Sequence, residues 1–141
     1  MELTELATVE LTYTALQWLD YDHDGQLYGT MEGSLEGRLS GSLRLTNFAP
    51  LRADGVNLPT LRGVLTTGDE AMVWVELDGV ATLREKGDQA RVFITTFRFR
   101  TGDERYAWLN ATFGLLEGVL ESGGVGGVAR GRLYACQATL T

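Results

Sequence analysis

The sequence predicts an all-β protein, a single antiparallel β-barrel of about eight strands that spans residues 1–141. Apolar and polar residues alternate along most of the chain, which is the pattern of strands with one apolar face. Turn residues divide the chain into about eight or nine such segments, as in β-sandwiches and β-barrels. Glycines recur within the apolar face of the longest segment, and the bends that they allow favour a barrel.

The glycine-rich segment is YGTMEGSLEGRLSGSLRL, residues 28–45, in which Gly29, Gly33, Gly37 and Gly41 recur every fourth residue. This spacing would put the glycines on one face of a helix, but four interior glycines would cost a helix about 4 kcal/mol relative to alanine. As a strand, the segment has its leucines and glycines on one face and its polar residues on the other. Since strands rarely exceed about 10 residues, we expect a bend near Gly37 that divides the segment into two strands.

The other strands are predicted from the same alternation, at residues 3–13, 60–67, 71–83, 90–100, 111–122 and 129–140. Short turns are predicted at residues 20–26, 68–70, 86–89 and 122–127. Residues 47–59 are predicted to form the one long irregular loop, with a turn at Asp54 and Gly55. Because this loop is long, a role as a lid over a ligand site is an alternative to a simple turn. Residues 101–110 do not alternate, and we expect Asp103 to cap one helical turn there.

Composition narrows the class of protein. A chain of 141 residues is long enough for one domain with its own core. The net charge of −7 argues against a nucleic-acid groove, which is normally basic. The single cysteine, Cys136, excludes an internal disulfide. The sequence shows no charged-then-apolar leader and no long apolar run, so we expect a cytoplasmic protein without a membrane partner.

The hexapeptide Arg-Tyr-Ala-Trp-Leu-Asn at residues 105–110 resembles the signature of a mostly bacterial family of small uncharacterised proteins, a domain of unknown function. The glycine-rich segment and residues 53–79 are also similar to that family, so the likeness extends over residues 28–134. The chain departs from the family pattern at Glu70, where glycine is common, and at Ala111, where arginine is common. The resemblance implies an antiparallel barrel like those of streptavidin and the lipocalins, and it implies no agreed activity.

Aromatic and polar residues near the hexapeptide are the candidates for a ligand site at one mouth of the barrel. The predicted ligand-binding residues are Arg105, Asn110, Tyr106, Trp108, Trp74 and Arg62. The guanidinium of Arg105 suits a ligand carbonyl or carboxylate, because its fork donates two parallel hydrogen bonds. The structural alternative is that Trp108 and Leu109 plug one end of the barrel and Tyr106 packs beside them. In that case Arg105 pairs with a nearby carboxylate, such as that of Asp103 or Glu104.

Three functions are compatible with these residues. The first is the binding of a small, partly apolar organic molecule at the barrel mouth. The second is a cofactor-free isomerase, cyclase or lyase that transfers protons through Glu117, Asp54 or Tyr134. The third is a barrel with a filled interior that acts by self-association, and a homo-oligomer joined through an edge strand is plausible in each case.

The sequence predicts neither a metal site nor a cofactor. His23 is the only histidine, which excludes a histidine-rich metal site and leaves no partners for a catalytic triad. An acidic run, Asp20, Asp22 and Asp24, precedes Gly25 as it would in a calcium-binding loop. Such a loop needs a glutamate six residues after its glycine, and that position is Met31.

Overall fold

The computed structural model describes residues 1–140; Thr141, the last residue of the predicted domain, lies outside the described residues. The described part contains nine strands and one 3₁₀ helix, namely β1 (Glu2–Asp20), β2 (Gly25–Gly37), β3 (Gly41–Asn47), β4 (Pro50–Leu51), β5 (Thr60–Thr67), β6 (Met72–Leu83), β7 (Arg91–Arg100), η1 (Glu104–Ala111), β8 (Phe113–Leu120) and β9 (Val128–Gln137). No helix within residues 1–140 has the length and apolar character needed to cross a membrane.

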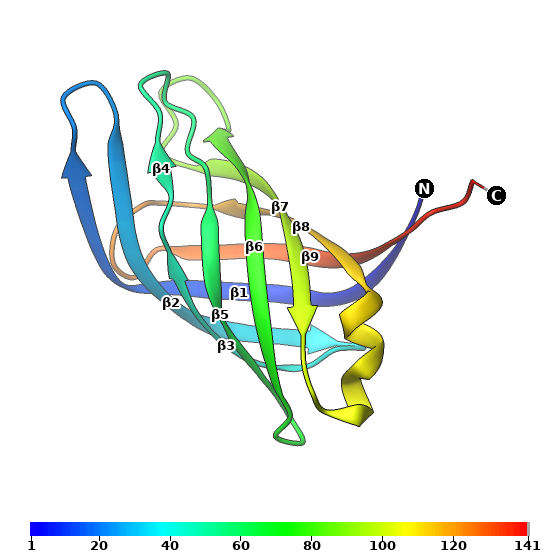
Figure 1. The fold of residues 1–141 in the computed structure, drawn as a ribbon. Coiled ribbons are helices and arrows are strands. Elements are labelled where there is room, and N and C mark those ends of the chain that lie inside the picture. The colour runs from blue at the N-terminus through cyan, green and yellow to red at the C-terminus, as the bar shows by residue number, and fades with distance from the viewer. Residues whose placement is uncertain (141) are drawn as a thin grey trace.

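Eight of these strands close into an antiparallel β-barrel (Figure 1). Each barrel strand pairs with the next one along the chain, and β9 pairs with β1 to close the ring. The short strand β4 adds to β2 outside this ring through the pairs Gly25 with Leu51 and Gln26 with Pro50. The arrangement is an up-and-down meander, so successive connections lie at alternate ends of the barrel. The predicted fold class is therefore confirmed.

The glycine-rich segment turns at Gly37, as predicted. Gly37 has φ of +150°, a conformation that L side chains rarely adopt, and it ends strand β2. The Ser40 hydroxyl accepts from the Gly37 N–H at 3.1 Å and donates to the Gly37 carbonyl at 2.9 Å, which fixes the connection to β3. Within β2, a Cβ on Gly33 would collide with the carbonyl of Glu10 in the neighbouring strand β1. Glycine at this position therefore allows the close approach of the two strands.

Strand β1 is longer than the predicted residues 3–13. It runs from Glu2 to Asp20 and contains two register irregularities, one between Glu5 and Ala7 and one between Tyr13 and Ala15. Each irregularity adds a residue that shifts the alternation by one position. The pattern in the sequence is therefore lost at both places, although pairing with the neighbouring strands continues.

The two ends of the barrel differ in how they are filled. In the half next to η1, the inward side chains are large and fully buried, namely Leu35, Leu43, Leu65, Val73, Val75, Phe97 and Leu133. The rings of Phe97 and Phe99 pack with their centroids 4.9 Å apart. Leu109 of η1 is fully buried against this cluster and covers the end of the barrel. The Asp103 side chain accepts from the N–H of Arg105 and caps η1, which confirms the predicted helical turn.

Candidate functional site

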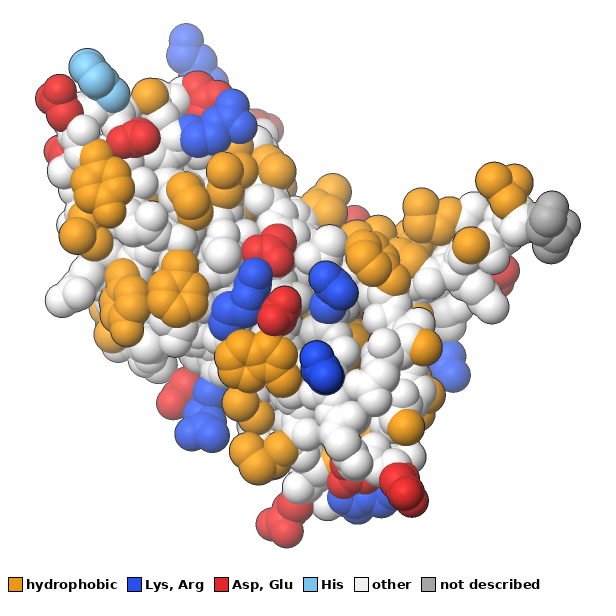
Figure 2. All heavy atoms as spheres, viewed as in Figure 1, with side chains coloured by type: hydrophobic (Ala, Val, Ile, Leu, Met, Phe, Trp, Pro, Cys, Tyr) orange, Lys and Arg blue, Asp and Glu red, His pale blue; other side chains and the backbone are white. Residues whose placement is uncertain are grey.

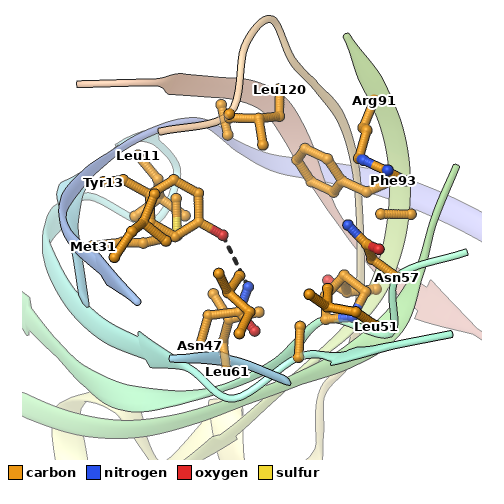
Figure 3. Close-up of a pocket in the computed structure, with 18 of the residues that line it drawn as sticks. Leu11, Tyr13, Met31, Asn47, Leu51, Asn57, Leu61, Arg91, Phe93 and Leu120 are labelled. Carbon is orange, nitrogen blue, oxygen red and sulfur yellow. Dashed lines mark hydrogen bonds between the residues drawn. The ribbon is translucent and has the colours of Figure 1, made fainter. Parts of the chain in front are cut away.

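The opposite half of the barrel contains a cavity of about 440 Å³ (Figure 3). Its walls come from the inward faces of the barrel strands, and its rim comes from the loop between β4 and β5 and from the turn between β8 and β9. Small inward side chains keep this half open: Ala49, Ala81 and Ala129 are buried and line the cavity. Leucines, Met31 and Phe93 supply most of the remaining wall, so the cavity is largely apolar.

A buried tyrosine and a buried asparagine form a polar group in this apolar wall. The side-chain amide of Asn47 donates from Nδ2 to the Tyr13 hydroxyl oxygen at 2.9 Å, and Figure 3 shows this contact at the edge of the open space. The Asn47 Oδ1 atom accepts from the backbone N–H of Thr60 at 3.1 Å. Burial raises the pKa of Tyr13, and the hydrogen bond from Asn47 opposes that shift. The phenol therefore stays protonated at neutral pH.

Thr95 is a second polar residue in the cavity wall. It lies on the inward face of β7, between Phe93 and Phe97, and its exposed fraction is only 2%. Its hydroxyl oxygen has no hydrogen-bond partner among the residues that the structure describes. A buried hydroxyl without a partner costs free energy of about 1–3 kcal/mol.

Arg91 carries the only charge among the described residues that line the cavity. It lies at the start of β7, and Figure 3 places it across the open space from Tyr13 and Met31. Its Nη1 atom donates to the backbone carbonyl of Gly55 at 2.8 Å. This bond joins strand β7 to the loop that the sequence singled out as a possible lid.

The residues predicted for a ligand site at the hexapeptide lie away from the cavity, because η1 covers the opposite end of the barrel. The guanidinium of Arg105 lies 2.8 Å from the Asp103 carboxylate and 3.1 Å from that of Asp69. The Tyr106 hydroxyl donates to Asp69 at 2.8 Å. The polar groups of Arg105 and Tyr106 are thus paired within the protein. The pairing of Arg105 with Asp103 is the contact that the structural alternative predicted.

The other two predicted ligand-binding residues of the hexapeptide, Asn110 and Trp108, also lie away from the cavity. The Asn110 side chain accepts from the Thr101 N–H at 2.8 Å and donates to the Thr101 carbonyl at 2.9 Å, so it closes the loop that leads into η1. Trp108 is 47% exposed and does not plug the barrel, which corrects that part of the structural alternative. Leu109 is the one fully buried side chain of η1, and the partly buried Tyr106 packs against the same core cluster.

Trp74 and Arg62 lie on the outer face of the barrel. The Trp74 indole N–H donates to the Glu76 carboxylate at 2.9 Å, and the Arg62 guanidinium donates to both oxygens of Asp78, at 3.1 and 3.2 Å. Figure 2 shows positive and negative side chains intermixed in the middle of one face. Neither residue lines the cavity, because both occupy the outward positions of β5 and β6.

The three candidates for proton transfer lie outside the cavity as well. Glu117 and Tyr134 are neighbours on the outer face of β8 and β9, where the Tyr134 hydroxyl lies 3.3 Å from the Glu117 carboxylate. Asp54 sits in the loop between β4 and β5, where its carboxylate accepts from the Val56 N–H and pairs with Arg52. The Val56 hydrogen bond and then the Arg52 contact lower the pKa of Asp54. Among residues 1–140 there is no group of three or more histidine, cysteine or acidic side chains placed to hold a metal ion.

Four cavity-lining residues with polar side chains, namely Tyr13, Asn47, Thr95 and Arg91, were not predicted as site residues. A signal for them is present in the sequence. Thr95 interrupts a face of phenylalanines, and Asn47 follows Leu43 and Leu45 on the apolar face of its strand. A polar residue on the apolar face of a predicted barrel strand is the pattern that would have found Asn47 and Thr95.

Comparison with known proteins shows the fold and no more. No protein-family model and no curated protein matches the chain. A β-barrel like protein from Acinetobacter baumannii has a TM-score of 0.81 at 19% identity, with 96% of each chain covered. A protein with unknown function from Clostridium acetobutylicum has a TM-score of 0.80 at 18% identity, with 97% of this chain and 100% of that chain covered. An enzyme from Penicillium herquei has a TM-score of 0.67 at 19% identity, with 94% of this chain and 93% of that chain covered. The chain is therefore similar in fold to uncharacterised small β-barrel proteins.

Proposed function

We propose that this protein binds one small, largely apolar organic molecule in the cavity at the open end of the barrel. The observation that carries this proposal is the cavity itself, whose volume of about 440 Å³ lies within the range of ligand sites, about 300–1,000 Å³. Its wall of leucines, alanines, Met31 and Phe93 with a few polar groups is also typical of such sites.

The positions of the ionisable side chains favour binding over proton transfer. Glu117, Asp54 and Tyr134 do not line the cavity, and within the described residues no carboxylate or imidazole does. An isomerase, cyclase or lyase of the predicted kind needs an acid and a base that both reach the substrate. The third possibility, a barrel with a filled interior, does not account for the open half next to Arg91.

The test uses the neutral, apolar fluorophore N-phenyl-1-naphthylamine as a probe. We expect wild-type protein to enhance its emission, and Ala81→Phe to weaken binding by about tenfold or more because the new ring occupies the cavity. The matched control is Val80→Phe, which adds the same ring at the next residue on the outer face, where Val80 is 48% exposed. Equal affinity of both variants would refute binding in the cavity, and native mass spectrometry of freshly purified protein would reveal a retained molecule.

A further inference from the structure

We infer that the ligand presents an uncharged carbonyl oxygen to the Tyr13 hydroxyl, which is oriented as a hydrogen-bond donor into the cavity. This inference rests on the proposed function, because it requires that the cavity be occupied. It names the chemical class of the ligand: an apolar molecule with a ketone, aldehyde, ester or amide carbonyl at its buried end.

The orientation of the Asn47 amide follows from its two partners. The backbone N–H of Thr60 is a donor only, so the atom of Asn47 that lies 3.1 Å from it has to be the carbonyl oxygen Oδ1. The other side-chain atom is then the amine Nδ2, and it faces the Tyr13 hydroxyl oxygen at 2.9 Å. Asn47 therefore donates to Tyr13, and the hydrogen-bond network leaves no freedom to reverse this bond.

The proton of the Tyr13 hydroxyl is consequently unused by the protein. The hydroxyl oxygen accepts from Asn47, and no acceptor for its own proton is found among residues 1–140. Tyr13 is only 6% exposed, and its ring and hydroxyl lie beside the open space in Figure 3. Because a hydroxyl that accepts one hydrogen bond becomes a better donor of the next, Asn47 prepares Tyr13 to donate to a ligand.

Burial keeps this donor available, since the raised pKa of Tyr13 means that the phenol remains protonated at neutral pH. Thr95 supplies an independent observation at the same cavity. Its buried hydroxyl has no partner within the described part of the chain, so the wall contains a second polar atom that a ligand would satisfy. One hydroxyl without a partner and one hydroxyl with an unused proton, both in the wall of one apolar cavity, point to a ligand that carries oxygen.

The uncharged state of the oxygen follows from its surroundings. The donors near Tyr13 are neutral, and the one charged residue of the lining, Arg91, lies across the cavity in Figure 3. A carboxylate next to Tyr13 would lose its hydration without gaining a cation, and that loss is costly in an apolar site. A carbonyl oxygen needs only the donors that are present.

Two naphthalene probes with the same number of non-hydrogen atoms test the inference, because one carries a carbonyl group and the other does not. Prodan carries a propionyl ketone, and N-phenyl-1-naphthylamine carries none. The quantity measured is the affinity for prodan divided by the affinity for N-phenyl-1-naphthylamine. We expect Tyr13→Phe and Asn47→Asp to lower this ratio by about five- to tenfold, which corresponds to the loss of one buried hydrogen bond.

Asn47→Asp is the decisive variant, because it keeps the shape of the side chain and removes its N–H. At about pH 9 the carboxylate is ionised and accepts the Tyr13 proton, which turns the donor away from the cavity. The matched control is Tyr106→Phe, which removes a hydroxyl that donates to Asp69 at the opposite end and should leave the ratio unchanged. A ratio that stays at the wild-type value in Asn47→Asp, with N-phenyl-1-naphthylamine still bound, overturns the inference and leaves the proposed function intact. Failure of wild-type protein to bind either probe overturns the proposed function itself.

Discussion

The Arg91 guanidinium donates a hydrogen bond of 2.8 Å to the backbone carbonyl of Gly55 and thereby fastens the tip of a loop to the rim of the cavity. The base of that loop is held separately, by backbone pairing between Asn57 and Ala81. Within the loop, Asp54 pairs with Arg52, a contact that shapes the tip without attaching it to the barrel. The mobility of the tip should therefore depend on Arg91.

We predict that Arg91→Ala raises the hydrogen-exchange rate of the amides at residues 52–57 by up to about tenfold, because one hydrogen bond is lost. Hydrogen–deuterium exchange with mass spectrometry measures this rate. Arg84→Ala is the control, since Arg84 pairs with Asp88 and Glu121 and has no bond to the loop. Unchanged exchange in Arg91→Ala would mean that the backbone pairing at Asn57 holds the loop by itself.

We predict that Leu109→Ala lowers the free energy of unfolding by about 2–5 kcal/mol, because it leaves a cavity under η1 where the side chain is fully buried. Urea denaturation followed by circular dichroism measures the loss. Trp108→Ala, at the adjacent position, should cost about 1 kcal/mol or less because the indole is 47% exposed. A larger loss for Trp108 than for Leu109 would contradict the assignment of Leu109 as the plug.

We predict opposite effects of the same substitution at two buried threonines. Thr95→Val should raise the free energy of unfolding of the ligand-free protein by about 1 kcal/mol, since the hydroxyl it removes has no partner. Thr67→Val should lower it by about 1–3 kcal/mol, because the Thr67 hydroxyl donates to Asp69 and accepts from the Ala71 N–H. Chemical denaturation of both variants measures the difference. Destabilisation of the free protein by Thr95→Val would show that its hydroxyl has a partner.

We predict that the contacts of the Asp69 and Asp103 carboxylates with η1 become weaker in acid. The Thr67 hydroxyl, then the Tyr106 hydroxyl and the Arg105 charge, lower the pKa of Asp69. Hydrogen bonds from the side chain and then the backbone N–H of Arg105 lower the pKa of Asp103. Because both pKa values are lower in the folded state, the stability that these groups contribute is fully present above their unfolded pKa, about 4, and is lost as the pH falls through the folded pKa values.

Urea midpoints measured between about pH 6 and pH 2 test this prediction. Tyr106→Phe removes one of the hydrogen bonds that hold Asp69 ionised, so the midpoint of this variant should depend less steeply on pH than that of wild type. An equal or steeper dependence would show that the Tyr106 hydroxyl does not stabilise the Asp69 carboxylate.

Alternation along the strands predicted the fold because a closed barrel has one apolar side, its interior. The bend at Gly37 and the cap at Asp103 were also predictable, since each depends on local chemistry within a few residues. The full length of β1 was not predictable in this way. Each of its two register irregularities shifts the alternation by one residue, so the pattern in the sequence is interrupted while the strand continues.

The residues predicted for the site lie away from the cavity for a topological reason. In an up-and-down barrel successive connections lie at alternate ends, so the loop with Asp54 and the connection with Arg105 belong to opposite ends. Counting strands along the sequence would have separated these two residues. Which end of the barrel contains the cavity depends on the size of the inward side chains, such as Ala81 in the open half and Val75 in the filled half. No single sequence motif indicates this difference.

Leu109 and the cavity lined by Tyr13 lie at opposite ends of the barrel. A substitution of Ala49 or Ala81 would alter the shape of the cavity and leave the packing around η1 unchanged. The size of the open space can therefore change by substitution while the packing that closes the other end of the barrel stays the same.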